Sequence, residues 1–279
     1  MIINEHISNA EEKWLKISRE YLEEKFRNTF LPSHDLKHHL RTWGYARSIL
    51  IELSRFQTGI DDSIAEAALL ATLFHDTGMI QTHDSHHGEI SKKYYLDFLK
   101  TCKMDFPALH DDILQAIEIH DHKDEYVYTP FSFNSQPDIL TLTSIADDMD
   151  ALGTIGIYRY AEIYMHRHIN HKSLGIRIME NASTRFNNFS KASMLLPGIV
   201  IRSKVRYQQL INFYDQYNQQ ILLETDPETV LSGHIGVINY INEFCVRGTT
   251  RPENIPETLK FYSVGNFITD FFGDLSKEL

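Results

Sequence analysis

The stretch AALLATLFHDTG, residues 67–78, constrains the fold of this chain more than any other. Its apolar run has the length and composition of a buried helix, and it ends abruptly in His75 and Asp76. We expect Gly78 to take the left-handed geometry that ends many helices. A carboxylate at the end of a buried helix is costly unless it is paired or bound to a cation. The pair therefore indicates either a capped helix end with a hydrogen-bonded core histidine or a pair of metal ligands.

Helical periodicity covers most of the chain, and clear β-strand alternation is absent, so the sequence predicts an all-α fold. Ser8 and Glu11 have the spacing of a capping box at the start of the first helix. Residues 172–200 give no clear pattern. The predicted helices cover residues 8–30, 33–56, 63–75, 87–102, 108–121, 138–151, 200–222, 225–245 and 257–277, and residues 152–169 are expected to be helical after their glycines.

Several of these helices carry His or Asp inside or at the end of an apolar pattern. The candidate metal ligands are His38, His75, Asp76, His87, His120 and Asp147. Imidazole and carboxylate together suit Mn, Fe, Co, Ni or Zn, whereas magnesium, although compatible, prefers more oxygen. Two imidazoles and two carboxylates can hold one dication, and two further imidazoles allow a second ion with Asp76 as the bridge. Paired ions of this kind can assist a phosphoryl displacement.

Composition limits the partners and the location. The formal net charge of −11 argues against nucleic acid or an anionic membrane as the main partner, although a local metal site can still attract a small phosphorylated ligand. The two cysteines, Cys102 and Cys245, give no disulfide framework. The N-terminus is polar and acidic, unlike a secretory signal, and no apolar run approaches the roughly 20 residues of a membrane span. We therefore expect a cytoplasmic protein.

Five segments give the chain a resemblance to the HD superfamily of metal-dependent phosphohydrolases, over roughly residues 30–165. They are HDLKHHLRTWGYA (34–46), ALLATLFHDTG (68–78), HHGEIS (86–91), AIEIHD (116–121) and ADDMDALGTIGIYR (146–159). The family order of ligands is His, His-Asp, then Asp. Its register selects His38 over His39 and Asp147 over Asp148, and Ser91 four residues after His87 favours His87 over His86.

The resemblance also implies a domain organisation. The HDxxHxxR opening at residues 34–41 and the segment ADDMDALGTIGIYR are similar to those of uncharacterised bacterial HD hydrolases with one catalytic domain, which implies a hydrolase but no substrate. The GYP motif of the cyclic-di-GMP branch and the synthetase half of the bifunctional alarmone enzymes are both missing. We expect an HD-type helical bundle in residues 1–222, including the N-terminal helix, and an additional C-terminal helical extension in residues 223–279.

Other residues are candidates for roles around the metals. Asp76 is predicted to be catalytic as the bridging ligand, and His34, one turn before His38, to contact phosphate or carry a proton. Arg159 and Lys123 are candidates for binding an anionic substrate, with solvated side chains as the alternative. Asp150 is expected to support a ligand rather than to be one. Lys37 and Arg41 are expected on the solvated face of their helix.

The resulting hypothesis is a phosphohydrolase that cleaves a phosphate ester of a nucleotide or another small phosphorylated metabolite with metal-activated water. One or two divalent ions would be the cofactor. The same six ligands also occur in HD-type mixed-valent di-iron oxygenases, which is the alternative enzyme. A nucleotide-sensing module that binds without turnover is the third hypothesis. The aromatic C-terminal region leaves open a partner or a homo-oligomer.

Overall fold

The structure is a computed structural model, and it describes residues 2–56, 59–84, 86–121 and 128–279. Helices make up the ordered elements of these ranges, and no strand occurs among them, which confirms the predicted all-α class. The internal contacts divide the chain into two compact units. The first comprises Met1–Thr29, His34–Asp150 and Asn187–Ile201, and the second comprises Phe30–Ser33, Ala151–Phe186 and Arg202–Leu279.

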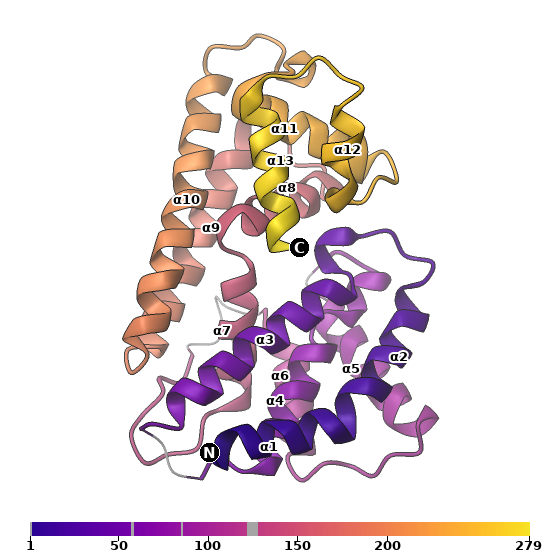
Figure 1. The fold of residues 1–279 in the computed structure, drawn as a ribbon, viewed down its shortest axis with the longest axis vertical. Coiled ribbons are helices and arrows are strands. Elements are labelled where there is room, and N and C mark those ends of the chain that lie inside the picture. The colour runs from indigo at the N-terminus through magenta and orange to yellow at the C-terminus, as the bar shows by residue number, and fades with distance from the viewer. Residues whose placement is uncertain (1, 57–58, 85, 122–127) are drawn as a thin grey trace. The chain divides into compact units, whose positions relative to one another are not determined.

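The first unit is built from helices that come early in the chain (Figure 1). Its α-helices are α1 (Ile2–Ala10), α2 (Lys16–Phe26), α3 (Leu36–Leu53), α4 (Asp62–Phe74), α5 (His87–Thr101), α6 (His110–Ile119) and α7 (Ile139–Asp150). Shorter elements are the π-helical turn η1 (Glu11–Leu15) and the 3₁₀ turns η2 (Pro32–His34) and η3 (Thr77–Ile80). The tip of the hairpin formed by α9 (His171–Ala192) and α10 (Pro197–Ile221) also belongs to this unit.

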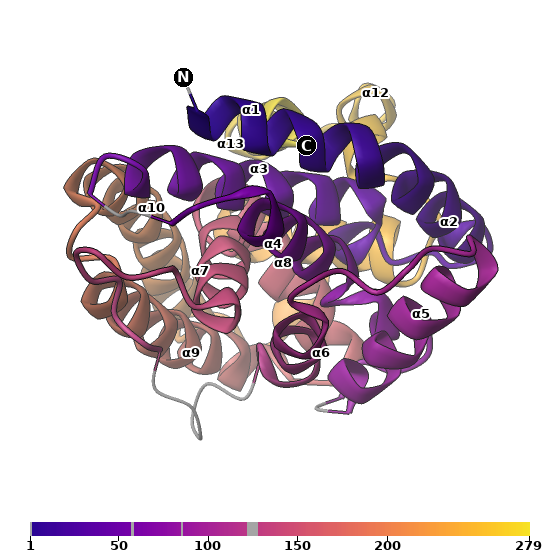
Figure 2. The ribbon, with the colours of Figure 1, turned by 90° about the horizontal axis from the view of Figure 1, so that it is seen from below.

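Helix α4 lies at the centre of the first unit, with α1, α3, α6 and α7 packed around it (Figure 2). Asp61 caps the helix, because its side chain accepts a hydrogen bond from the Ile64 backbone at 3.1 Å. The helix then consists almost entirely of buried Ala, Leu and Phe side chains, so every face can pack against a neighbour. Its C-terminal end therefore delivers His75 and Asp76 to the interior of the bundle.

Two predicted helix starts in this unit are wrong. The first helix begins at Ile2 rather than Ser8, because buried Ile7 and Ala10 extend the apolar stripe towards the N-terminus. It continues through η1 into α2. The next long helix begins at Leu36 rather than Ser33, because Asp35 caps it by accepting from the Lys37 backbone at 3.0 Å.

The second unit has its own apolar core, in which Tyr158, Tyr214, Tyr217 and Phe272 are fully buried. Its remaining elements are α8 (Gly153–His166), η4 (Pro227–Thr229), α11 (Gly233–Ile241), the π-helical turn η5 (Asn242–Val246), η6 (Pro252–Asn254), α12 (Ile255–Leu259) and α13 (Asn266–Glu278). No described helix is long and apolar enough to cross a membrane.

The C-terminal helices differ from their predicted bounds. Residues 172–200 gave no clear pattern, and most of this stretch belongs to the long helix α9 (His171–Ala192). The helix expected from residue 225 begins only at Gly233, because Pro227 starts a separate 3₁₀ turn. The helix expected over 257–277 is interrupted and forms α12 and α13. The two compact units are not divided at the domain boundary expected between residues 222 and 223. That boundary concerns domains that fold separately, and it stays a prediction.

Candidate metal centre

Asp76 is the residue on which the candidate site converges. It follows α4 at the start of η3, with φ −105° and ψ 10°, in the sparsely populated bridge region where many active-site residues lie. Its side chain is buried, and each of its two carboxylate oxygens faces a different pair of histidines. One carboxylate therefore links two clusters of side chains that could hold a metal ion.

The first cluster comprises His38, His75, Asp76 and Asp147, whose ligand atoms all lie within 4.8 Å of one another. Nε2 of His38 and Nε2 of His75 are 3.1 Å apart, and each is 3.3 Å from Oδ2 of Asp76. Oδ1 of Asp147 lies 3.9 Å and 3.8 Å from the same two nitrogens. Helices α3, α4 and α7 each contribute to this group.

The second cluster comprises Asp76, His87 and His120. Nε2 of His87 lies 3.2 Å from Oδ1 of Asp76, and Nε2 of His120 lies 3.0 Å from the same oxygen. The two nitrogens are 3.4 Å apart. His87 begins α5 and His120 follows α6, so the second cluster adds two further helices to the site.

The hydrogen bonds on the far side of each ring define which nitrogen faces the site. Nδ1 of His75, His87 and His120 lies 2.8, 2.7 and 3.0 Å from the backbone oxygens of Thr72, Asp84 and Ile117. A carbonyl oxygen only accepts, so each Nδ1 carries a proton. In the neutral ring the Nε2 lone pair then points at Asp76. Lone pairs and carboxylates that converge in a buried site fit a cation, and the donor set suits a transition metal.

His38 is held in the same orientation by a carboxylate. Asp150, fully buried, accepts from Nδ1 of His38 at 2.7 Å, as expected of a residue that supports a ligand. Arg41 grips this carboxylate with Nε at 2.8 Å and a terminal nitrogen at 3.1 Å. The expectation that Arg41 is solvated is therefore wrong. The spacing carried the signal, because Arg41 comes three residues after His38 and Asp150 three after Asp147.

In the metal-free protein, protons on two of the imidazoles take the place of the positive charge that a cation would supply. Burial lowers the pKa of His75, but Asp76 and Asp147 outweigh it and raise the pKa to about 10. Burial is likewise outweighed at His87, where Asp76 raises the pKa to about 9. Burial and its charged neighbours lower the pKa of His120. The pKa of Asp76 lies well below its usual value, because the surrounding imidazoles outweigh its burial.

Gly78 allows the second cluster to approach the first. Its φ is not positive, so the expected left-handed helix end is wrong. The structure needs glycine here because a Cβ would collide with the backbone carbonyl of His87. The Gly78 backbone donates to Oγ of Ser91 at 2.7 Å, which fixes the start of α5 against η3. A close approach of backbones, rather than a backbone torsion, explains this glycine.

The neighbouring histidines and aspartates lie in different surroundings. His86 is exposed, with its ring 3.9 Å from a carboxylate oxygen of Glu89, so the structure brings His87 and not His86 to Asp76. Asp148 accepts from the Tyr128 hydroxyl at 2.8 Å. His39 is buried and packs edge-on against the ring of His75, at 5.3 Å between centroids.

The predicted catalytic and substrate residues are placed as follows. His34 is buried in the first unit, and its Nε2 lies 3.7 Å from Oδ2 of Asp76. Arg159 is buried in α8 of the second unit, where its Nε donates to the backbone oxygen of Ser33 at 3.1 Å. Lys123 lies outside the described residues.

An all-α bundle with buried His and Asp side chains around a shared carboxylate defines a helical protein with a candidate divalent-metal centre. Residues 35–155 match the family model of the HD domain, and this span includes all six candidate ligands. This family suggests metal-dependent hydrolase-type activity. A search of curated proteins and a search of solved structures each found no match.

Proposed function

We propose that this protein is a metal-dependent phosphohydrolase that cleaves a phosphate ester of a nucleotide or another small phosphorylated metabolite. The observation that carries the proposal is the arrangement at Asp76. Nε2 of His38 and His75 faces one of its oxygens, and Nε2 of His87 and His120 faces the other. A bridging carboxylate between two histidine pairs is suited to two divalent ions held close together.

The proposed ligands of the first ion are His38, His75, Asp76 and Asp147, and those of the second are Asp76, His87 and His120. Mn, Fe, Co, Ni and Zn match this mixture of nitrogen and oxygen, and magnesium is compatible. Divalent ions in such a site act as Lewis acids and lower the pKa of water for attack on phosphorus. Asp76 and Asp147 together offset much of the positive charge of the ions.

The chain's own residues supply position and protons. Asp150 and the three backbone oxygens keep the imidazoles turned towards Asp76, so the donor set needs little rearrangement to bind metal. His34 lies beside Oδ2 of Asp76, where its imidazole is placed to hold a proton or contact a substrate phosphate. Arg159 and Lys123 remain proposed contacts for the substrate anion.

The test combines metal content with turnover. Purified protein and the His75→Ala and Asp76→Ala variants would be measured by elemental analysis. Each would then be assayed for phosphate release from a panel of nucleotides and other phosphate esters, with Mn, Co, Ni, Mg and Fe added back. We expect both variants to lose metal and activity together, while His86→Ala, an exposed histidine beside the site, keeps both. Full metal stoichiometry in both variants would refute the ligand assignment.

A mixed-valent di-iron oxygenase is the second candidate, and the observation that favours it is the completeness of the second cluster. Four imidazoles and two carboxylates supply enough ligands for two iron ions. Iron-loaded protein that consumes oxygen but is inert towards the phosphate-ester panel would support the oxygenase. Phosphate release with no oxygen consumption would support the hydrolase.

A further inference from the structure

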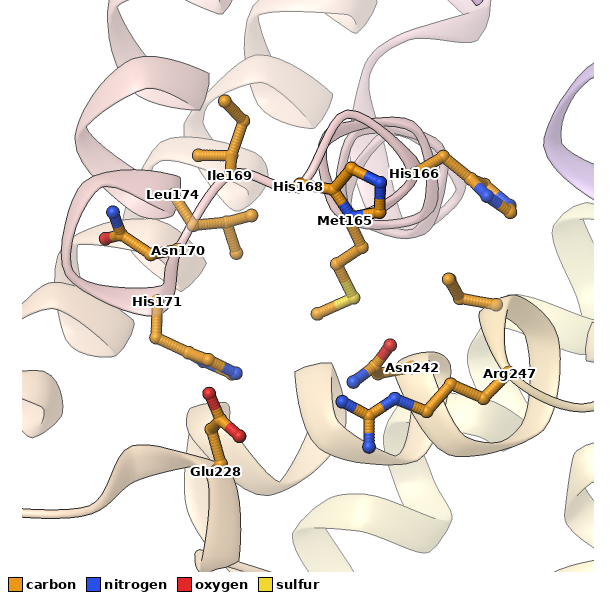
Figure 3. A pocket seen from close by; sticks show the side chains of 11 residues that line it. Met165, His166, His168, Ile169, Asn170, His171, Leu174, Glu228, Asn242 and Arg247 are labelled. Atoms are coloured by element: carbon orange, nitrogen blue, oxygen red, sulfur yellow. The ribbon is translucent and has the colours of Figure 1, made fainter.

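The second unit contains a cavity of about 560 Å³, and its lining shares no residue with the two clusters that could hold a metal ion. It lies between the C-terminal end of α8, the N-terminal end of α9, the turn η4 and the π-helical turn η5 (Figure 3). Its volume is in the range of small-molecule sites in proteins, roughly 300–1,000 Å³. Polar and charged side chains outnumber apolar ones in its lining, so the cavity suits a polar ligand better than an apolar one.

One part of the lining can receive an anion. Asn242 and Val246 lie in η5 and Arg247 follows it, and the Arg247 backbone N–H bonds to the Asn242 carbonyl at 2.8 Å. Such π-helical turns are rare in proteins, and those that occur are often found at functional sites. Figure 3 shows the Arg247 guanidinium extending beside the Asn242 amide. A guanidinium next to an amide presents several N–H donors to a carboxylate or phosphate oxygen.

Another part of the lining accepts hydrogen bonds. The Tyr217 hydroxyl donates to the His171 backbone oxygen at 3.1 Å, so it accepts from the protonated Nδ1 of His171 at 2.9 Å. The Nε2 of His171 is therefore left as an acceptor. Burial lowers the pKa of His171, which keeps the ring neutral near pH 7. Its ring points towards the Glu228 carboxylate in Figure 3, so two acceptors lie together.

His168 supports the same interpretation. Its φ is 57°, and its backbone and that of Ile169 close the end of α8 with bonds to Met165 and Tyr164 at 2.9 and 3.0 Å. This position at a helix end is usually glycine, because other residues pay a conformational cost there. Here an imidazole that lines the cavity occupies it. Its retention in a strained conformation agrees with a role for the side chain in the pocket.

The apolar part of the lining includes Met165, Ile169 and Leu174. Figure 3 shows the Met165 thioether reaching into the space beside the polar groups. The imidazoles at this cavity do not converge on one point, and among the described residues the groups able to hold a metal lie elsewhere. An organic ligand therefore fits this cavity better than a metal ion.

We propose that this cavity is a second ligand site, and that it binds a small zwitterion such as an α-amino acid. The anionic group of the ligand binds Arg247 and Asn242, its ammonium group donates to Glu228 and His171, and its carbon frame packs against Met165 and Leu174. The site is independent of the metal centre, since its lining residues all belong to the second unit.

The experiment uses the full chain after chelator treatment, so that the metal centre cannot bind the probes. Glycine, the nineteen standard L-amino acids, inorganic phosphate and AMP would each be screened by thermal shift, and hits would be titrated by calorimetry. We expect at least one amino acid to bind, and Arg247→Gln and Glu228→Gln each to weaken binding by about tenfold or more, because each removes a charged hydrogen-bond partner. Lys172→Gln, an exposed residue of α9 outside the lining, is the matched control and should bind normally.

Each other outcome overturns the assignment. Binding of no amino acid at 10 mM, or binding that neither cavity variant weakens, removes the proposed site. Phosphate or AMP binding that depends on Arg247 but not on Glu228 would replace the zwitterion with a simple anion. The His75→Ala variant separates this site from the metal centre, because it should bind the amino acid as the wild type does.

Discussion

The Asp150 carboxylate accepts a hydrogen bond from Nδ1 of His38 at 2.7 Å, and neither side chain is exposed to solvent. Both Asp150 oxygens also receive N–H groups of Arg41. The hydrogen bond to Asp150 fixes the orientation of the His38 ring. Asp150→Asn should therefore weaken metal binding by about 10–100-fold, the usual cost of losing such a partner. Metal affinity would be measured by competition with a chromophoric chelator.

Asp148→Asn is the matched control for this change. Asp148 lies in the same turn of α7 and loses the same charge, but it accepts from Tyr128 rather than orienting a ligand. Its metal affinity should stay near that of the wild type. Equal losses in the two variants would show that charge in this turn, and not the contact with His38, controls the affinity.

Gly78→Ala should destabilise the protein and loosen the second cluster. An added Cβ meets the His87 backbone, whose carbonyl carbon would lie 2.8 Å away, and the Ser91 nitrogen at 2.9 Å. Backbone cannot move aside as a flexible side chain can, so we expect a loss of about 1–3 kcal/mol or more in the free energy of unfolding. Denaturant titration would measure it.

Gly44→Ala, in the same unit, should stabilise the protein rather than destabilise it. Gly44 lies inside α3, and nothing lies within 4 Å of the place where its Cβ would be. Replacing a helical glycine with alanine should stabilise the fold by about 0.5–1 kcal/mol. If Gly78→Ala were as well tolerated as Gly44→Ala, the close approach of η3 and α5 would be wrong.

These two glycines show what sequence reasoning could and could not reach. The apolar run before His75 predicted a buried helix, helical periodicity predicted the all-α class, and the ordered motifs gave the resemblance to the HD superfamily, whose family model matches residues 35–155. The reason for Gly78 was beyond reach, because it depends on a backbone contact with residues nine or more positions away. The role of Arg41 was missed although its spacing from His38 was visible, because that spacing does not by itself show that Asp150, on another helix, is its partner.

Helix ends were predicted less well than helix centres. Ser8 and Ser33 are favourable caps by type, but the apolar stripe through Ile7 and the side chain of Asp35 decide where the helices begin. The break between α12 and α13 near Gly265 was hidden by the aromatic residues around it. Local propensity identifies candidate ends, and packing in the folded chain selects among them.

Metal binding should release protons and strengthen as the pH rises. In the metal-free protein the pKa of His75 is raised to about 10 and that of His87 to about 9. At pH 7 both rings therefore hold a second proton and are positively charged. A metal requires the neutral ring, and each of these protons must leave. Calorimetry in buffers of different ionisation enthalpy would count the protons released. Affinity independent of pH between 6 and 9 would contradict this prediction.

The second proton on His75 also stabilises the metal-free protein, and this contribution is lost at high pH. The raised pKa of His75 contributes stability that is fully present below its unfolded value of about 6.5 and is lost as the pH rises through about 10. Added metal should offset this loss by binding the native state alone. Melting curves with chelator and with metal should therefore diverge as the pH increases.

His120→Gln should remove the second ion and leave the first. His120 contacts Oδ1 of Asp76, whereas the first cluster uses Oδ2 together with His38, His75 and Asp147. Elemental analysis should show metal content falling by half. The control His110→Gln changes a histidine at the other end of α6, where it should leave the metal content unchanged. Loss of all metal from His120→Gln would mean that the two clusters bind only as a unit.

His34→Gln should lower turnover while leaving metal in place. Nε2 of His34 lies 3.7 Å from Oδ2 of Asp76, and His34 is outside both groups of candidate ligands. Its ring is therefore placed to act on protons or phosphate beside the ions rather than to hold them. If it transfers a proton, kcat should fall by about 10²–10⁴-fold with unchanged metal content, and the pH profile should lose one ionisation. A rise in KM with constant kcat would instead indicate that His34 binds the phosphate equally in the ground and transition states.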